Sequence, residues 1–396
     1  MPSVAAVCRP PERLRKRLGA ARPRRLGRGV PFSWNNLSCL GVPQRDEPWG
    51  RTGSRFCRGA PLKLRPLAFE GVALATLISC AGALAARGQG IALASISDTA
   101  GWLVASAPAA LALGLTLQAL HRYAEGDDPR RFFGALRHPT WWAGWVRAWL
   151  ACWTTSFAYF WLKVSVPRLN AEPLDAALWQ LDRTLHLGTS PSRLAVAWLG
   201  APSVAGVLDA WYALWLPSVV WCLAFFAAAS EPRVRNGVVL SCVLLWALGA
   251  WLYVALPALG PIFVFPEVFA SVAGGLPRAA AAQAALLENY QRVLAGAGPE
   301  AIRHTLGIAA LPSLHVGFHV LFTLWARAEA PLLFLPFAAG TLLTFLGSLV
   351  TGWHYAVDGY LGAALAALCY GLARRIESAP GALTSRQAAP AESPRR

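Results

Sequence analysis

The sequence predicts an all-α protein, a polytopic transmembrane bundle of about eight helices with interfacial helices on the extracytoplasmic side. Of its 396 residues, 56% are hydrophobic and only 14% are charged, whereas soluble domains carry roughly 25% charged residues. The apolar residues gather into runs that are long enough to span a bilayer. The basic residues between these runs lie in connections where they would fix the orientation of the helices across the membrane. Together these features indicate a chain that is solvated mostly by lipid.

Eight apolar runs are candidate membrane spans, because a bilayer-spanning helix needs about 20 mostly apolar residues. The first two lie outside the region that carries polar motifs, and we interpret them as an accessory pair. The sixth and the eighth are short, as expected of helices whose outer ends lie below the membrane surface around a site. The runs cover 66–86, 99–120, 141–162, 205–229, 237–256, 311–327, 331–350 and 356–373.

The basic residues between the runs predict their orientation. If the helices alternate, the basic short connections and the basic N-terminal tail all fall on one side, which the positive-inside rule makes the cytoplasm. Segments 163–203 and 257–310, which are longer and less basic per residue, then lie outside. Eight helices with both termini in the cytoplasm satisfy every connection. The inner basic residues are Arg122, Arg130, Arg131, Arg137, Arg233, Arg235, Arg327, Arg374 and Arg375.

The two ends of the chain hold nearly all of its net charge of +16. Residues 1–65 carry 15 Lys or Arg against three acidic residues, and residues 374–396 carry five Arg against two Glu. A nucleic-acid-binding domain would instead spread positive charge over a folded face, so we expect no nucleic-acid partner. Residues 1–65 show no apolar periodicity, and we expect a disordered cytoplasmic tail there.

Two segments on the outer side are predicted to form helices along the membrane interface. Segment 174–200 places leucines at positions 174, 178, 181 and 185, a helical spacing that is typical of an amphipathic interfacial helix. Segment 279–295 is Ala-rich with a polar end. We interpret it as a second short helix.

The motif Pro312-Ser313-Leu314-His315 opens the sixth run. Proline suits the first position of a helix, because its missing N–H group would be unpaired there anyway. The free N–H groups of a first helical turn form an anion site. We therefore predict that these amides and Ser313 hold a phosphate while His315 donates a proton.

A second motif, Thr351-Gly352-Trp353-His354 followed by Asp358, lies between the last two runs. Gly352 permits a tight turn, and His354 is expected to open the last helix. Asp358 then lies one helical turn further along on the same face. Its carboxylate can bond one imidazole nitrogen and leave the other free to attack. We also expect Thr351 and Gly352 to contact the substrate.

The predicted topology brings the two motifs together. The sixth and eighth helices both enter from the outer face, so His315 and His354 are expected at the same depth. Lys163, one of only three lysines in the chain, lies at the outer end of the third helix and is a candidate phosphate-binding cation. Polar groups at membrane depth are costly, so each of these residues is a functional candidate.

Two other interpretations of these residues stay open. The histidines and Asp358 can form a structural polar cluster that ties helices together. His315, His319, His354 and Asp358 also form two pairs spaced by four residues, which could chelate zinc or iron; we favour a site without metal. We interpret His319 as a hydrogen-bonded structural residue. The eight cysteines contain no C-x-x-C pair and predict neither a disulfide framework nor a zinc site.

The sequence P-S-L-H, followed about 40 residues later by T-G-W-H-Y-A-V-D-G, resembles the second and third signature motifs of the phosphatidic acid phosphatase type 2 superfamily. The closer resemblance is to its inositolphosphotransferase branch, the relatives of inositol phosphorylceramide synthase. That branch has P-S-L-H where most lipid phosphatases have P-S-G-H. The segment from Lys163 to Pro167, with Asp175, Asp182 and Gly188, is also similar to that branch. The resemblance covers roughly 140–373.

The resemblance implies a mechanism. His354 would be the nucleophile that forms a phosphohistidine, Asp358 would orient it, and His315 would protonate the leaving oxygen, with no metal or other cofactor. Two phosphatase features are absent: Ser348 stands where that pattern has an Arg, and no K-x6-R-P motif begins at Lys163. We therefore expect Lys163 first of all to hold the phosphate, with Arg292 and Arg303 of the outer segment as further candidates.

These residues predict an integral membrane phosphotransferase of lipid metabolism. It would move a phospho-headgroup from a phospholipid or lipid phosphate donor to a polar alcohol, a lipid alcohol or water. The alternative is a hydrolase that acts on a lipid phosphate or a polyprenyl diphosphate with the same histidines. A third possibility is a catalytically idle transporter or scaffold on the same fold.

The chain is accordingly expected to have four parts. Residues 1–65 form a basic tail, 66–138 an accessory helix pair with its cytoplasmic loop, 139–375 a six-helix catalytic domain, and 376–396 a second cytoplasmic tail. The composition is rich in Ala and Arg and poor in Lys, which suggests a GC-rich bacterial genome. We therefore expect a bacterial inner-membrane protein whose active site faces the periplasm.

Overall fold

The computed structural model describes residues 66–90, 93–126 and 129–378. Within these ranges every regular element is a helix, which confirms the predicted all-α class. The predicted N-terminal tail and residues 379–396 lie outside the described residues.

Each predicted span corresponds to one helix or to a pair of helices. Among the described residues, five helices are long and apolar enough to cross a membrane, or six if the bent pair α6–α7 counts as one span. Several apolar helices of this kind indicate an integral membrane protein. The elements that match the predicted spans are α1 (Ala68–Ala86), α2 (Leu93–Ala124), α4 (Pro139–Leu169), α7 (Pro202–Ala213) with α8 (Trp215–Ala227), α9 (Pro232–Ala255), α12 (Leu314–Glu329), α13 (Phe334–Val350) and α14 (Ala356–Ser378).

The predicted span 205–229 is wrong as one continuous helix, because the structure interrupts it at Leu214. α7 ends at Ala213 and α8 begins at Trp215. In a continuous helix Pro217 would have no N–H to donate to the Ala213 carbonyl, and its ring would clash with that carbonyl. In addition, α7 is bent by 120° relative to α6 (Pro191–Leu199).

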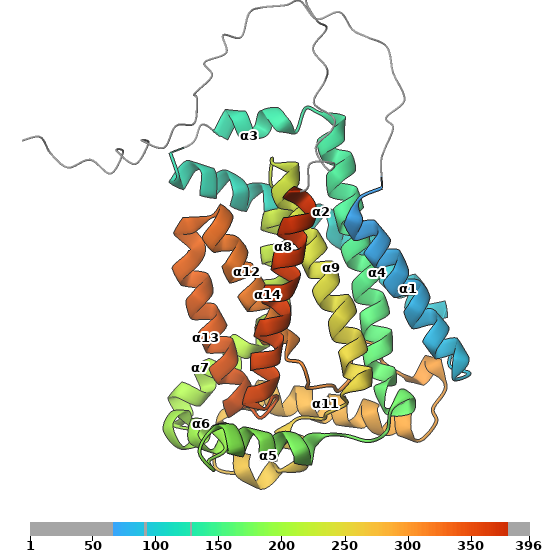
Figure 1. The fold of residues 1–396 in the computed structure, drawn as a ribbon, viewed down its shortest axis with the longest axis vertical. Coiled ribbons are helices and arrows are strands. Elements are labelled where there is room, and N and C mark those ends of the chain that lie inside the picture. Colours follow the sequence, from blue (N-terminus) through green and yellow to red (C-terminus); the bar gives the residue numbers. More distant parts are fainter. Residues whose placement is uncertain (1–65, 91–92, 127–128, 379–396) are drawn as a thin grey trace, which may run out of the picture. The chain divides into compact units, whose positions relative to one another are not determined.

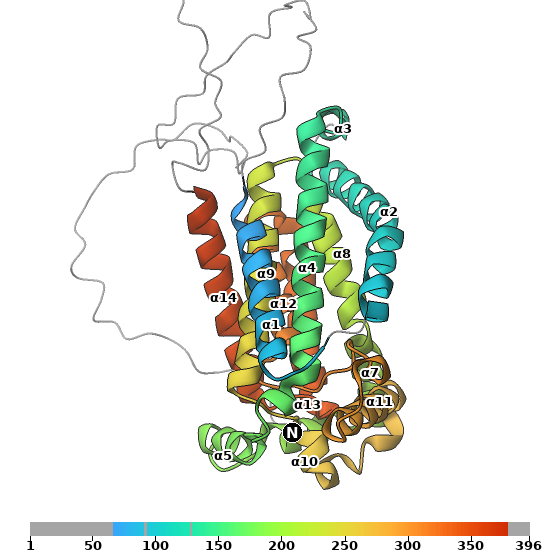
Figure 2. The same ribbon diagram turned by 90° about the vertical axis from the view of Figure 1, so that its right-hand side faces the viewer.

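Helix α9 lies at the centre of the bundle and packs against α1, α4, α8, α12 and α14 (Figures 1 and 2). Val238, Val239 and Leu240 of α9 are fully buried. Trp325 of α12 donates its indole N–H to Ser241 of α9 at 3.0 Å. In lipid, close packing and interhelical hydrogen bonds of this kind hold helices together, because the surrounding lipid is as apolar as the side chains.

Short helices form a layer at the end of the bundle where α12 and α14 begin, and α3 (Pro129–Ala135) lies at the other end (Figures 1 and 2). The predicted helix in 174–200 is two helices, because Leu187 and Gly188 between them adopt positive φ angles of 55° and 85°. The predicted helix at 279–295 is confirmed. The layer contains α5 (Asp175–Leu185), α6, α7, α10 (Pro261–Val264) and α11 (Pro277–Leu294).

Three buried aspartates hold the parts of this layer to one another and to the start of α14. Each carboxylate accepts two backbone N–H groups from a segment that is distant in the sequence, at 2.7–3.0 Å. At α14 and α11 these bonds satisfy the free amides of a helix start, as a capping residue does within a single helix. The aspartates and their donors are Asp175 with Leu259 and Gly260, Asp182 with Ala356 and Val357, and Asp209 with Arg278 and Ala279.

Replacing Asp209 with Ala should lower the free energy of unfolding by about 2–4 kcal/mol, because two N–H groups at the start of α11 lose their acceptor. Thermal unfolding of the purified protein in detergent would show this as a lower midpoint. Asp209→Asn keeps one acceptor oxygen and should lower the unfolding midpoint less than Asp209→Ala does. An unchanged midpoint for Asp209→Ala would contradict the capping role.

Candidate active site

The first turn of α12 positions His315. Ser313 caps the helix, because its Oγ accepts the Val316 N–H at 3.4 Å. The Ser313 N–H donates to the Asp358 carbonyl at 2.9 Å. A Cβ at Gly362 would collide with the Ser313 carbonyl, so this glycine permits α12 and α14 to approach closely. The starts of the two helices are therefore held together through their backbones.

The turn between α13 and α14 positions His354. Gly352 has a φ angle of +75°, and a Cβ at this residue would lie 2.9 Å from Ile262 Cβ and from Phe269 Cζ. The tight turn predicted at this glycine is confirmed, and it requires glycine for both reasons. The Gly352 carbonyl also accepts the Ile262 N–H at 3.0 Å, so α10 packs directly on the turn. Helix α14 begins at Ala356, two residues later than the predicted start at His354.

His315, His354 and Asp358 form a continuous chain of polar contacts. His315 Nδ1 lies 3.0 Å from His354 Nε2, and His354 Nδ1 lies 3.4 Å from Asp358 Oδ2. His354 is 2% exposed and Asp358 is 0% exposed. The structure thus brings together the three residues on which the sequence motifs centre. It shields His354 and Asp358 from water, whereas His315 is partly exposed.

The first amides of α14 already have partners within the protein. Asp358 Oδ2 accepts the Tyr355 N–H at 2.9 Å. Asp182 accepts the N–H groups of Ala356 and Val357 at 2.8 and 2.9 Å. These carboxylates orient the start of α14, and they leave its first amides unavailable to a bound anion.

At α12 fewer backbone N–H groups are free to bind an anion than the sequence predicted. Ser313 Oγ accepts the Val316 N–H at 3.4 Å, and the Tyr253 hydroxyl interacts with the Leu314 backbone. Of the first-turn amides, the His315 N–H is the one that these two hydroxyls leave for a ligand. Ser313, predicted to bind phosphate, is fully buried and serves as the cap of the helix.

Lys163 lies in the last turns of α4, with its ammonium group over two tyrosine rings. Its Nζ is 5.9 Å from the centroid of the Tyr159 ring and 5.4 Å from that of Tyr253. Its positive charge acts on both His315 and His354. No carboxylate of the described ranges lies within ion-pair distance of it, so its charge is available to an anionic ligand.

Thr351 has a structural partner in this fold. Its Oγ1 donates to the Gly347 carbonyl at 2.6 Å, and its own carbonyl accepts from Gln283 at 2.8 Å. Both bonds stabilise the end of α13 and the turn that follows. The expectation that Thr351 contacts the substrate stays a prediction.

His319 has partners at both ring nitrogens. Nδ1 lies 2.9 Å from the His315 carbonyl oxygen, and Nε2 lies 3.3 Å from Ser218 Oγ. These contacts support the interpretation of His319 as a structural residue. In the part of the chain that the structure describes, no three His, Cys, Asp or Glu side chains are arranged to hold a metal ion.

Two aromatic residues that the sequence analysis did not single out flank His315. The ring centroids of Tyr212 and Trp215 lie 4.9 and 4.2 Å from that of His315. They come from either side of the break between α7 and α8. No motif marks them, because they lie in an apolar run whose break is signalled only by Pro217.

Burial, with a smaller contribution from the positive charge of Lys163, lowers the pKa of His354 from 6.5 to about 3. A neutral imidazole is the form that has a free electron pair for attack. The surroundings of His354 therefore favour the neutral form across the physiological pH range.

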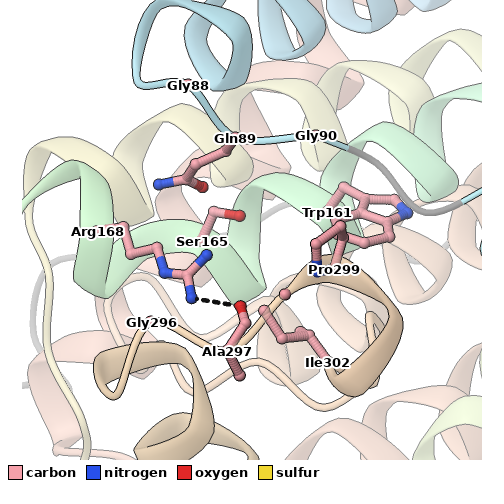
Figure 3. A pocket seen from close by; sticks show the side chains of 11 residues that line it. Gly88, Gln89, Gly90, Trp161, Ser165, Arg168, Gly296, Ala297, Pro299 and Ile302 are labelled. Carbon is pink, nitrogen blue, oxygen red and sulfur yellow. Dashed lines mark hydrogen bonds between the residues drawn. The ribbon is translucent and has the colours of Figure 1, made fainter.

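A cavity of about 190 Å³ lies apart from the histidines (Figure 3). The connection after α1, helix α4 and the loop after α11 line it. Arg168, at its edge, donates to the Val293 and Ala297 carbonyls at 2.9 Å. His315 and His354 do not line it, so it is separate from the candidate active site.

Comparison with known proteins supports a family assignment for this region. Residues 176–372 match the family model of the PAP2 superfamily. The matched region contains His315, His354 and Asp358, whereas Lys163 lies before it. No curated protein and no solved structure matches the chain.

His354 should remain neutral at pH 5 in the free protein, because its pKa lies below the ordinary value of 6.5. NMR of histidine-labelled protein in detergent micelles would follow its protonation, and loss of the signal in His354→Gln would assign it. Lys163→Met removes a neighbouring positive charge and should therefore raise the pH at which His354 is half protonated. A His354 signal that titrates near pH 6.5 in the unchanged protein would contradict this electrostatic environment.

Proposed function

Starting from the match of residues 176–372 to the PAP2 superfamily, we propose that the protein is an integral membrane phosphotransferase. It transfers a phospho-headgroup between lipids, or between a lipid and a polar alcohol, through a phosphohistidine. The observation that carries this proposal is the 3.0 Å contact between His315 and His354, with Asp358 on the other nitrogen of His354.

The contacts of His354 assign its nucleophilic nitrogen. Asp358 Oδ2 faces Nδ1 and favours the tautomer in which Nδ1 carries the proton. The electron pair is then on Nε2, which attacks the phosphorus of the donor. The N–P bond forms as the bond from phosphorus to the leaving oxygen breaks.

His315 supplies the proton that this step requires. Its Nδ1 lies next to His354 Nε2. When phosphorus enters between the two rings, the negative charge of the phosphoryl group favours the protonated form of His315, and its Nδ1–H gives the proton to the leaving oxygen. In the second half of the reaction His315 takes the proton from the acceptor alcohol. The acceptor oxygen then attacks phosphorus and the N–P bond breaks.

Charge on the phosphoryl oxygens is balanced mainly by Lys163 and the His315 N–H. Neither arginine of the lipid phosphatase pattern is present: Ser348 occupies one position, and its Oγ donates to the Phe345 carbonyl at 2.7 Å. Positioning and charge stabilisation by preorganised groups account for most of the catalysis of phosphoryl transfer.

Burial of the site favours transfer to an alcohol over hydrolysis. His354 and Asp358 are shielded from solvent, so a phosphohistidine formed there is protected from water until an acceptor enters. A lipid alcohol can reach such a site from the membrane. We place the site on the extracytoplasmic side, with both termini in the cytoplasm, because the basic connections lie at the opposite ends of the helices.

His354→Ala should lower turnover by at least about a thousandfold and abolish the covalent intermediate, because the attacking nitrogen is lost. Quenching the reaction at alkaline pH and mass spectrometry of the peptide that contains residue 354 would detect the phosphohistidine. His138→Ala is the matched control, because this histidine is exposed and its side chain makes no capping bond at α4. Full activity in His354→Ala would refute the mechanism.

Adding a lipid alcohol should convert a phospholipid that is labelled in its headgroup phosphate into a new labelled lipid. Thin-layer chromatography of reactions with and without the alcohol would separate the products. The alcohol should raise the transfer product at the expense of water-soluble label. Release of the same labelled phosphate in both reactions would instead identify a hydrolase that uses the same histidines.

A further inference from the structure

The hydroxyl of Tyr212 is buried and has no hydrogen-bond partner among the described residues. The residue as a whole is 7% exposed. A buried polar group without a partner destabilises the fold that contains it, so most such groups in proteins are paired. An unpaired hydroxyl at this position therefore requires a reason.

Two ring neighbours of Tyr212 belong to the candidate active site or to the turn that bears His354. Its ring lies 4.9 Å from that of His315 and stacks on Trp353 at 6.4 Å. The charge of Asp358 acts on its hydroxyl, as does Tyr159. The Tyr212 side chain thus lies beside His315 and Trp353, where the proposed reaction places the phosphorus centre.

The other tyrosine hydroxyls near the site already have partners. The ring centroids of Tyr159 and Tyr253 lie 5.9 Å apart, and their hydroxyls interact with each other. The Tyr355 hydroxyl donates to Asp175 at 2.9 Å. Of these four tyrosines, Tyr212 alone has a buried hydroxyl without any hydrogen-bond partner among the described residues.

We infer that the Tyr212 hydroxyl donates a hydrogen bond to a phosphoryl oxygen of the substrate, which makes Tyr212 a substrate-binding residue beside Lys163. This inference rests on the proposed function. A phosphoryl oxygen is a charged acceptor, and hydrogen bonds to charged groups are the stronger kind. The hydroxyl would supply part of the binding that arginines provide in the lipid phosphatase pattern.

The competing account is a hydrogen bond within the protein. Asp358 Oδ1 is also buried without a donor, so a small movement could bring the Tyr212 hydroxyl onto it. Tyr212 would then act through Asp358 and His354 and would not touch the ligand. The two accounts differ in how the effect of removing the hydroxyl depends on Asp358.

Orthovanadate, an analogue of the phosphoryl group in transfer, provides a probe that does not require the true substrate. Its affinity for the purified full chain in detergent can be measured by calorimetry. Tyr212→Phe keeps the ring that packs on His315 and Trp353 and removes only the hydroxyl. We expect this variant to bind orthovanadate roughly tenfold or more weakly, as for a lost hydrogen bond to a charged group.

Two further variants sharpen the comparison. Tyr370→Phe is the control, because Tyr370 lies towards the end of α14 that is far from the site and its ring packs on Trp325. This variant should bind orthovanadate as the unchanged protein does. In an Asp358→Ala background, which removes both carboxylate oxygens, Tyr212→Phe should weaken binding by the same factor as before. If the effect of Tyr212→Phe disappears in that background, the hydroxyl acts through Asp358 and the inference is wrong.

The outcomes also separate this inference from the function on which it rests. If the unchanged protein binds no orthovanadate and His354→Ala keeps full transfer activity, the proposed function fails. If the unchanged protein binds orthovanadate and Tyr212→Phe binds it equally well, only the role of Tyr212 fails.

Discussion

The backbone hydrogen bond from the Ser313 N–H to the Asp358 carbonyl joins the first turns of α12 and α14. Each of these turns lies next to one of the two facing histidines, so this bond sets the distance between the rings. A side chain at Gly362 would push the helices apart. A shift of even 1 Å between the helices would break a 3.0 Å imidazole contact, and catalysis is sensitive to errors of that size.

The layer of short helices gives this arrangement its rigidity. Helices as short as α5 are marginal by themselves, because a helix needs a costly nucleus and gains little from a few turns. Asp182 of α5 accepts the first amides of α14, and Asp175 of the same helix holds the segment that precedes α10. Buried carboxylates are stable only where donors surround them. The layer and the turn that bears His354 therefore stabilise each other.

Aromatic side chains surround His315 of the site and the nearby ammonium group of Lys163. Aromatic rings of Tyr212 and Trp215 enclose His315, and Lys163 lies among the rings of Tyr159 and Tyr253. An ammonium group in such surroundings is attracted to the ring faces, yet it keeps its donors for an anion. In this low-dielectric setting each charge acts more strongly on a phosphoryl group than it would in water.

The amino-acid sequence by itself determined the helical class, the positions of most apolar helices and the meeting of His315, His354 and Asp358. These features follow from local patterns: runs of apolar residues, a proline or glycine at a helix boundary, and a spacing of four residues that places Asp358 on the face of His354. The break at Leu214 was missed, although Pro217 is a local cause, because a proline does not show whether a span bends or ends.

Only the tertiary structure decided which groups complete the site. Asp182 reaches the start of α14 across 174 residues of chain, and no sequence period records a contact of that range. Tyr212 lay in an apolar run without any motif, and its approach to His315 depends on the bent path of α6, α7 and α8. Such contacts depend on how separate helices pack, whereas a sequence pattern reports only which face of one helix is apolar.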